Sequence, residues 1–175
     1  TKYAERLLSD LDTVDYLPKI RKQQEDWIGK SEGAEVTFRL NVPGQDAGKH
    51  QVTVFTTRPD TLYGATFLVV SPELAKTWMD VGWQAPAEVA SYVKEALSRS
   101  EMDRSNDTKE KTGVFSSVVG INPVNGKEIP VWVADYVLGN YGTGAIMAVP
   151  AHDTRDFAFA NGCLMLSGAK SHRLS

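Results

Sequence analysis

Residues 34–57 alternate apolar and polar side chains on either side of a short turn-like segment, and this pattern limits the fold more than any other feature of the chain. The apolar positions of the alternation are Val36, Phe38, Leu40, Val52 and Val54. A period of two places such residues on one face of a β-strand. Pro43 and Gly44 lie between the two stretches and are typical of a turn. We therefore predict a β-hairpin over Ala34–Thr57.

Helical patterns occur in three parts of the chain. Apolar residues at helical spacing predict two short helices before residue 29, separated near Pro18. A third pattern predicts an amphipathic helix between Pro86 and Ser100. A further helix is expected to begin at Thr154, with Asp153 as its N-cap.

Short apolar runs predict strands at residues 66–70, 129–133 and 145–149. The charged segment at residues 101–113 is interpreted as a solvated connection. Because helical and strand patterns both occur, the sequence indicates a mixed α/β fold.

The charge and cysteine content exclude several classes of protein. The formal net charge is −3, so the chain as a whole does not attract nucleic acid and any such contact must be local. A single cysteine, Cys163, rules out an internal disulfide and a cysteine-rich zinc site. No apolar run reaches the roughly 20 residues that a membrane-spanning helix needs. These features predict a cytoplasmic protein with no membrane partner.

Two polar loops, Thr56–Thr61 and His152–Asp156, each follow a predicted strand. Short loops that are fixed by a sheet hold their side chains in place, which favours a binding or catalytic site. Hydroxyl and carboxylate side chains are also what turns and helix caps require. Residue types alone therefore leave both interpretations open.

Several familiar site patterns receive no support. His152 beside Asp153 has no further ligands at metal-binding spacing, so no metal site is predicted. The chain has no GxSxG motif and no reactive context around Cys163, which argues against an acyl-enzyme mechanism. The glycines at 139, 142 and 144 lack the lysine of a phosphate loop and indicate a tight turn.

The two loops together resemble a known family. TTRPDT at residues 56–61 and GTGAIMAVPAHDTRDF at residues 142–157 are similar to the editing-domain signatures of leucyl-tRNA synthetases. WIGKSEG, KTGVF and INPVNGKEIPVWVADYVL add shorter matches, so the resemblance covers about residues 1–160. Valyl and isoleucyl enzymes carry related domains, but the combination of RPDT with HD-x-RD resembles the leucyl branch.

The resemblance implies both a fold and an activity. In this family a β-barrel-like editing domain with flanking helices is inserted into the catalytic domain. It hydrolyses the ester between a noncognate amino acid and the terminal adenosine of leucine tRNA; norvaline, isoleucine and methionine are the implied errors. Such a second site is needed because a hydrophobic pocket separates side chains that differ by one methylene by only ~1–3 kcal/mol.

The resemblance also implies roles for individual residues. Asp156 would receive the α-ammonium group of the substrate, and Thr61 would crowd the pocket and exclude leucine. Thr56 and Thr57 would hydrogen-bond the ribose, the ester oxygens or the attacking water. The remaining substrate-binding residues would support the tRNA end or line the pocket: Arg58, Met147, Val149, His152 and Asp153. We therefore assign catalysis to Thr56, Thr57 and Asp156, with no evident general base.

The same comparison predicts three segments. Residues 1–31 would form the edge of the catalytic domain and a connecting ribbon, and residues 32–160 an editing domain. Residues 161–175 are an unassigned tail that does not resemble the family, so we expect the domain to be truncated at its C-terminus. The chain contains neither a HIGH-type nor a KMSKS-type stretch, and aminoacylation is not expected from it alone.

The expected partners are the aminoacylated 3′ end of leucine tRNA and the rest of the synthetase. No cofactor is expected for editing, whereas ATP and magnesium would serve only the parent enzyme. Two alternatives stay open. The chain could be a noncatalytic fragment that only binds the aminoacylated tRNA end, or a structural module whose two loops act as caps.

Overall fold

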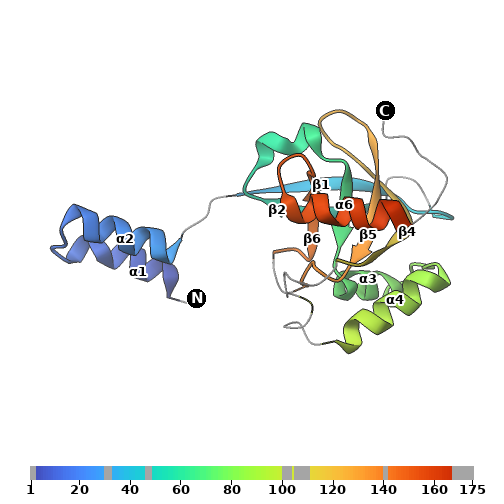
Figure 1. The fold of residues 1–175 in the computed structure, drawn as a ribbon, viewed down its shortest axis with the longest axis horizontal. Helices are drawn as coiled ribbons and strands as arrows, with labels where there is room; N and C mark the ends of the chain where they lie inside the picture. The colour runs from blue at the N-terminus through green and yellow to red at the C-terminus, as the bar shows by residue number, and fades with distance from the viewer. Residues whose placement is uncertain are drawn as a thin grey trace. The chain divides into compact units, whose positions relative to one another are not determined.

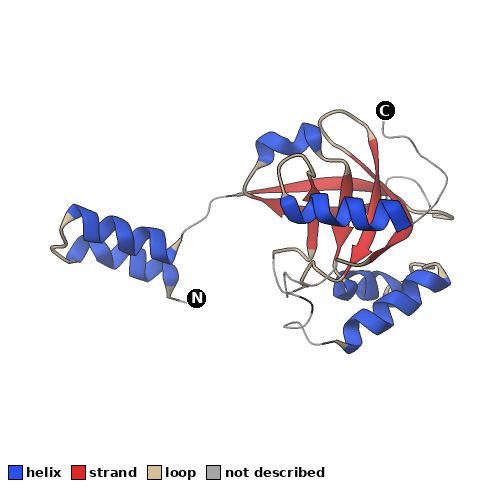
Figure 2. Cartoon of the chain, in the orientation of Figure 1, coloured by secondary structure: helices blue, strands red, loops and turns tan. Residues whose placement is uncertain are grey.

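The computed structural model describes residues 3–29, 33–45, 49–99, 104, 111–139 and 142–166. The chain divides into two compact units, Thr1–Gly33 and Ala34–Ser175. Figure 2 distinguishes the helical first unit from the second, which contains the strands.

The first unit contains the two helices that the sequence predicts, with a 3-10 turn between them. Its elements are α1 (Ala4–Asp10), η1 (Leu11–Thr13) and α2 (Pro18–Ile28). Pro18 is the first residue of α2, where the missing N–H of proline has no helical partner to lose. Gly29 ends α2 with φ 62° and donates its N–H to the carbonyl of Glu25 at 2.9 Å.

The second unit is built on one six-stranded sheet. Its strands are β1 (Ala34–Asn41), β2 (His50–Thr56), β3 (Phe67–Val70), β4 (Gly113–Ile121), β5 (Glu128–Ala134) and β6 (Ala145–Ala148). The strand order is β2-β1-β4-β5-β3-β6, and the two outermost strands, β2 and β6, also contact each other. The sheet therefore curls towards a barrel, as Figure 1 shows, and the mixed α/β, barrel-like fold expected from the sequence is confirmed.

The predicted hairpin is present. β1 and β2 pair antiparallel, with Phe38 opposite Val52 and both side chains buried. Gly44, in the connection between the strands, has φ 75°, a conformation that residues with a Cβ rarely adopt. The alternation of apolar residues therefore fixes the pairing as well as the buried face.

Strand β3 is buried on both faces, because two apolar clusters meet at it. Leu68 and Val70 belong to the main cluster, which also includes residues of α3 (Pro72–Asp80) and α4 (Ala87–Ser98). Phe67 and Val69 belong to a second cluster with Phe159 of α6. Figure 1 shows α6 lying across the sheet and α3 and α4 grouped at another side of it. A strand between two covered faces reads as a continuous apolar run, as this one does.

Helix α6 (Thr154–Leu166) begins where the sequence predicts and continues beyond Ala160, into the segment expected to be a separate tail. The assignment of residues 1–31, 32–160 and 161–175 to parts of a parent enzyme stays a prediction. Among the residues that the structure describes, no helix has the length and apolar character needed to cross a bilayer.

Two elements of the second unit carry no prediction from the sequence, β4 and α3. The apolar alternation of β4 is broken by a bulge between Phe115 and Val119, where Ser117 has φ 64°. The buried Ser116 hydroxyl donates to the carbonyl of Val131 at 2.6 Å, which ties the bulge to β5. Helix α3 does have an N-terminal signal, since Ser71 caps it by accepting the N–H of Leu74.

The interpretation of residues 101–113 as a solvated connection is wrong at Arg104. This side chain is buried, with a residue exposure of 5%, and it pairs with Glu73 of α3. A buried charge is stable only when it is paired, and a search for charged stretches in a sequence gives no sign of such a partner.

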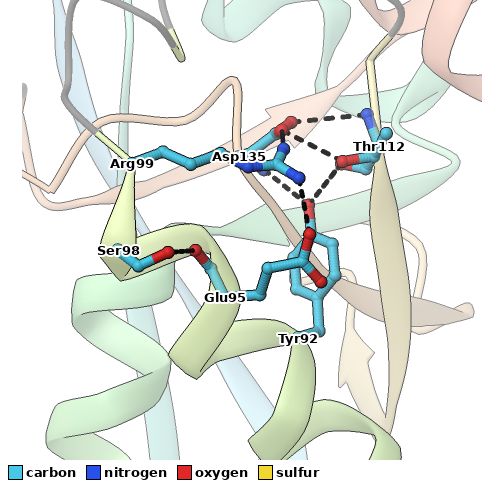
Figure 3. Close-up of polar contacts among 6 residues, drawn as sticks. All are labelled: Tyr92, Glu95, Ser98, Arg99, Thr112 and Asp135. Carbon is cyan, nitrogen blue, oxygen red and sulfur yellow. Dashed lines mark hydrogen bonds and ion pairs between the residues drawn. The ribbon is translucent and has the colours of Figure 1, made fainter.

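A polar cluster ties α4 to the sheet (Figure 3). The Tyr92 hydroxyl lies 2.8 Å from the carbonyl oxygen of Thr112, to which it donates, and accepts the N–H of Asp135 at 3.1 Å. The Asp135 carboxylate accepts the Thr112 hydroxyl at 3.0 Å and lies 3.7 Å from the guanidinium of Arg99. These contacts fix the segment that leaves β5.

The 3-10 segment η2 (Pro59–Gly64) is anchored by one fully buried amide. Asn122, which is 0% exposed, donates from Nδ2 to the carbonyl of Leu62 at 2.9 Å and accepts the N–H of Val124 at 3.1 Å. Polar groups in a dry interior are stable only when they are hydrogen-bonded. Asn122 therefore fixes the position of η2 against the sheet.

Replacing Asn122 with alanine should lower the free energy of unfolding by ~1–3 kcal/mol, because the buried carbonyl of Leu62 and the N–H of Val124 each lose their partner. Urea denaturation measures this loss. Asn125→Ala is the matched control, since Asn125 makes a similar contact with the N–H of Lys127 in the same turn but is exposed. Equal losses in the two variants would contradict the anchoring role.

Candidate active site

The two predicted loops lie at the same end of the sheet. β3 and β6 pair antiparallel with Phe67 opposite Ala148, and the N–H of Thr66 donates to the carbonyl of Ala148 at 3.0 Å. The segment that precedes β3 is therefore adjacent to the segment that follows β6. A Cβ built on Gly64 would lie 3.4 Å from Cγ1 of Val149, so η2 closely approaches the segment that leads into the second loop.

Electrostatics link the loops as well. Hydrogen bonds from Arg58 hold the pKa of the Asp60 carboxyl below its usual range. A smaller charge interaction with His152, in the second loop, acts in the same direction. His152 therefore lies close enough to the first loop to interact with Asp60.

Hydrogen bonds within the first loop fix its shape. Arg58 donates to both carboxylate oxygens of Asp60, at 2.9 and 2.8 Å, and the backbone N–H of Arg58 donates to the Thr56 hydroxyl at 3.0 Å. Thr61 donates from its hydroxyl to the carbonyl of Arg58 at 2.8 Å, which restricts its side chain. Thr57 is exposed beside them. The loop thus presents hydroxyl groups from a fixed backbone.

The second loop is a tight turn closed by the cap of α6. The N–H groups of His152 and Asp153 both donate to the carbonyl of Val149, at 2.9 and 3.0 Å. Oδ1 of Asp153 accepts the N–H groups of Arg155 at 2.7 Å and Asp156 at 3.3 Å, so the predicted N-cap is confirmed. Burial opposes the charged form of Asp153, but these hydrogen bonds outweigh burial and lower its pKa.

Asp156 is the buried carboxylate of this region, with a residue exposure of 5%. Its Oδ2 accepts the N–H of Val149 at 2.8 Å, and its Oδ1 accepts the hydroxyl of Tyr136 at 3.3 Å. Burial raises the pKa of Asp156, the negative charge of Asp153 adds to this, and the two hydrogen bonds oppose it. The result is a carboxyl group with a pKa above the ordinary value.

The other predicted residues divide into exposed and buried groups. His152 is exposed beside the first loop, whereas Met147 and Val149 are buried in the main apolar cluster. Two cavities, of about 90 and 220 Å³, lie elsewhere: one beside Trp78 and Trp83, the other beside Tyr92 and Arg99. Neither cavity is lined by a residue of the predicted site. These two cavities therefore do not bear on the prediction of a substrate pocket between the loops.

No group of three or more potential metal-binding side chains occurs in the described part of the chain. The chemistry available at the two loops is that of hydroxyl groups, one buried carboxyl and exposed charges. This set can orient a polar substrate and a water molecule.

Sequence reasoning missed two residues that shape this region, Asn122 and Tyr136. Asn122 is visible in the sequence only as part of a turn pair, and its contact with Leu62 spans 60 positions. Tyr136 follows β5, and no local pattern marks it as a partner of Asp156. Their roles become visible only when the sheet is assembled.

Comparison with known proteins decides the family. The sequence model described as "Leucyl-tRNA synthetase, editing domain" matches residues 25–165, which include both loops. The chain belongs to the leucyl-tRNA synthetase editing-domain family. The resemblance predicted from the two signatures is therefore confirmed, and the leucyl branch with it.

Two relatives of the editing domain show how much of a synthetase it represents. The leucine–tRNA ligase of Roseiflexus castenholzii is 53% identical over 167 residues, which are 91% of this chain and 18% of that protein. The crystal structure of the Agrobacterium radiobacter K84 agnB2 LeuRS, a ternary complex LeuRS-tRNA-LeuAMS, matches with a TM-score of 0.63 and 35% identity. The match covers 95% of this chain and 20% of the chain in that structure. The chain thus spans about a fifth of the length of these relatives.

Removal of the α6 cap tests how firmly the second loop of the editing domain is held. Asp153→Ala should lower the free energy of unfolding by ~1 kcal/mol, because two N–H groups in the first turn of α6 lose their acceptor. Asp153→Asn retains a capping oxygen and should lose less. Thermal unfolding followed by circular dichroism compares the two. A loss of the same size in both variants would assign the effect to charge instead of capping.

Proposed function

We propose that this chain hydrolyses the ester bond of leucine tRNA that carries a wrong amino acid, as the editing part of a leucine–tRNA ligase. One observation carries the proposal: the antiparallel pairing of β3 with β6 brings the buried carboxyl of Asp156 to the sheet end where the hydroxyls of the first loop lie. Membership of the editing-domain family supports the same activity.

Asp156 receives the α-ammonium group of the bound amino acid. A carboxylate offers about four lone pairs, and the N–H of Val149 and the hydroxyl of Tyr136 occupy two of them. The remaining lone pairs can accept a cationic donor, and a charge-assisted contact of this kind orients the ester for attack. The ammonium charge also stabilises the ionised form of Asp156, which burial disfavours.

The first loop selects the side chain and positions the water. Thr61, fixed by its bond to the Arg58 carbonyl, occupies space that the γ-branched side chain of leucine would need. Thr56 accepts one N–H and keeps its own hydroxyl hydrogen available, so together with Thr57 it can hydrogen-bond the ribose, an ester oxygen or the attacking water. No side chain is assigned as general base, and catalysis rests on positioning of the water.

The remaining predicted residues complete the substrate contacts. Arg58 supports the tRNA end, directly or through its contact with Asp60. Met147 and Val149 form the pocket wall and His152 and Asp153 its floor.

The substrates are esters of norvaline, isoleucine or methionine, and the partners are leucine tRNA and the rest of the synthetase. Contact with tRNA is local, because the chain has a formal net charge of −3. Editing requires no cofactor in this scheme; ATP and magnesium serve aminoacylation by the parent enzyme, which we place in the cytoplasm.

A second function, binding of the aminoacylated tRNA end without hydrolysis, is favoured by the 5% exposure of Asp156. A carboxyl group with so little exposed surface is accessible to a substrate over only a small area. Incubation with norvalyl-tRNA separates the two functions: ester loss supports hydrolysis, and stable binding supports the second function.

Asp156→Ala should abolish hydrolysis of norvalyl-tRNA, because the ammonium group loses its partner. Asp156→Asn is the conservative variant. Its amide oxygen can accept the N–H of Val149 and its NH₂ can donate to the Tyr136 oxygen, so the local hydrogen bonds persist without the charge. We expect kcat/KM to fall by roughly 10- to 100-fold in this variant. Near-normal deacylation by both variants would place the ammonium anchor elsewhere.

Thr61→Ala should allow hydrolysis of leucyl-tRNA, because space opens for the γ-branch of the leucine side chain. Thr61→Val is the matched control, since valine keeps the bulk and loses only the hydroxyl. Release of leucine from leucyl-tRNA measures both. Continued sparing of leucyl-tRNA by the alanine variant, or equal activity of the two variants, would refute the steric role.

A further inference from the structure

Tyr136 contacts Asp156 from outside the two signature loops. It lies just after β5, and its hydroxyl is 3.3 Å from Oδ1 of Asp156. The other carboxylate oxygen, Oδ2, accepts the N–H of Val149. The two donors thus approach different oxygens, which fixes the plane of the carboxylate as well as its position.

The ring of Tyr136 is held by the same helix that carries Asp156. Its centroid lies 5.3 Å from that of Phe159, which is one turn further along α6 and almost fully buried. Phe159 in turn contacts Phe67 of β3 and Trp132 of β5 at 5.7 and 5.8 Å. An aromatic side chain packed in this way has little rotamer freedom, so its hydroxyl stays directed at one place.

We propose that Tyr136 is a positioning residue for editing, which orients the Asp156 carboxylate so that its remaining lone pairs meet the α-ammonium group of the substrate. This inference rests on the proposed function, because it assigns Asp156 to that group. Tyr136 itself does not touch the substrate and acts through Asp156.

The hydroxyl of Tyr136 is suited to donate under all ordinary conditions. Burial raises the pKa of this phenol, and the negative charges of Asp156 and Asp153 raise it further, so the proton stays on Tyr136. Donation to Oδ1 stabilises the ionised carboxylate and lowers the pKa of Asp156. The other groups that face this carboxylate are the N–H of Val149 and the charge of Arg155, which favour ionisation, and the charge of Asp153, which opposes it.

Removal of the Tyr136 hydroxyl should therefore change the pKa of Asp156 in one direction only. In Tyr136→Phe the pKa of Asp156 rises further above its ordinary value, because burial remains and one stabilising donor is lost. Asp156 must be ionised to bind an ammonium group. The acid limb of kcat/KM for hydrolysis should consequently move to higher pH, with a loss of roughly tenfold at neutral pH.

Tyr92→Phe is the matched control. It removes the other tyrosine hydroxyl that holds the segment after β5, through the N–H of Asp135 (Figure 3), and leaves both donors to Asp156 in place. Simple loosening of this segment would affect both variants alike, whereas only the Tyr136 hydroxyl, of the two, contacts the Asp156 carboxylate.

The experiment measures hydrolysis of norvalyl-tRNA against pH by the whole chain and the two variants, and follows the Asp156 carboxyl carbon by NMR titration without substrate. In Tyr136→Phe we expect both the acid limb of hydrolysis and the titration of Asp156 to shift to higher pH. In Tyr92→Phe we expect neither to shift. Unchanged curves in Tyr136→Phe, or equal shifts in both variants, would overturn the inference. Wild-type hydrolysis would then still support the proposed function.

Absence of hydrolysis by the wild-type chain would instead overturn the proposed function and, with it, the assignment of Tyr136. Thermal unfolding of each variant verifies that it is folded at every pH used.

Discussion

The antiparallel pairing of β3 with β6 is the constraint on which the candidate site depends. It sets Phe67 opposite Ala148, and thereby joins the end of η2 to the start of the second loop. The register is fixed by burial, since side chains of β3 alternate between the main cluster and the cluster under α6. A shift of one residue would turn the side chains of the main cluster towards α6, and those of the α6 cluster towards the main cluster. Each buried apolar side chain of this size contributes about 1.5–3 kcal/mol, so the register is strongly favoured.

The strands bring the two loops together, and buried polar side chains then fix the backbone beside each loop. Asn122 holds the carbonyl of Leu62 in η2, just after the first loop, and Asp156 holds the N–H of Val149, just before the second. Both contacts join a buried side chain to the backbone beside a loop, where an unpaired group would be costly. The loops can therefore be short, polar and partly exposed while their backbones keep one conformation.

The sequence predicts those parts of this structure that depend on local patterns. The hairpin of β1 and β2 follows from a period of two around a turn, and the N-cap at Asp153 follows from its position before a helical run. Strand β4 escapes prediction because the bulge at Ser117 interrupts its alternation. Burial of Arg104 depends on Glu73, which lies far away in the chain.

The candidate site also combines features that local sequence patterns predict with features that depend on long-range contacts. The residue types of the two loops are ambiguous in isolation, and only their joint resemblance to a family predicts that they act together. The proximity itself follows from the pairing of β3 with β6, which is a long-range property of the sheet. Tyr136 illustrates the limit: its ring packs on Phe159 and its hydroxyl meets Asp156, and neither contact has a spacing that sequence periodicity could reveal.

In the proposed function, the carboxylate that receives the substrate is the buried Asp156. Burial raises the pKa of this group, while two hydrogen bonds and its place in the first turn of α6 favour ionisation. In the proposed function an arriving ammonium group adds a third favourable contact, so ionisation and substrate binding reinforce each other. A neutral or acylated amino group provides no such stabilisation. Because the interaction is strong only in a poorly hydrated environment, the same burial that disfavours the free carboxylate increases discrimination for a free α-ammonium group.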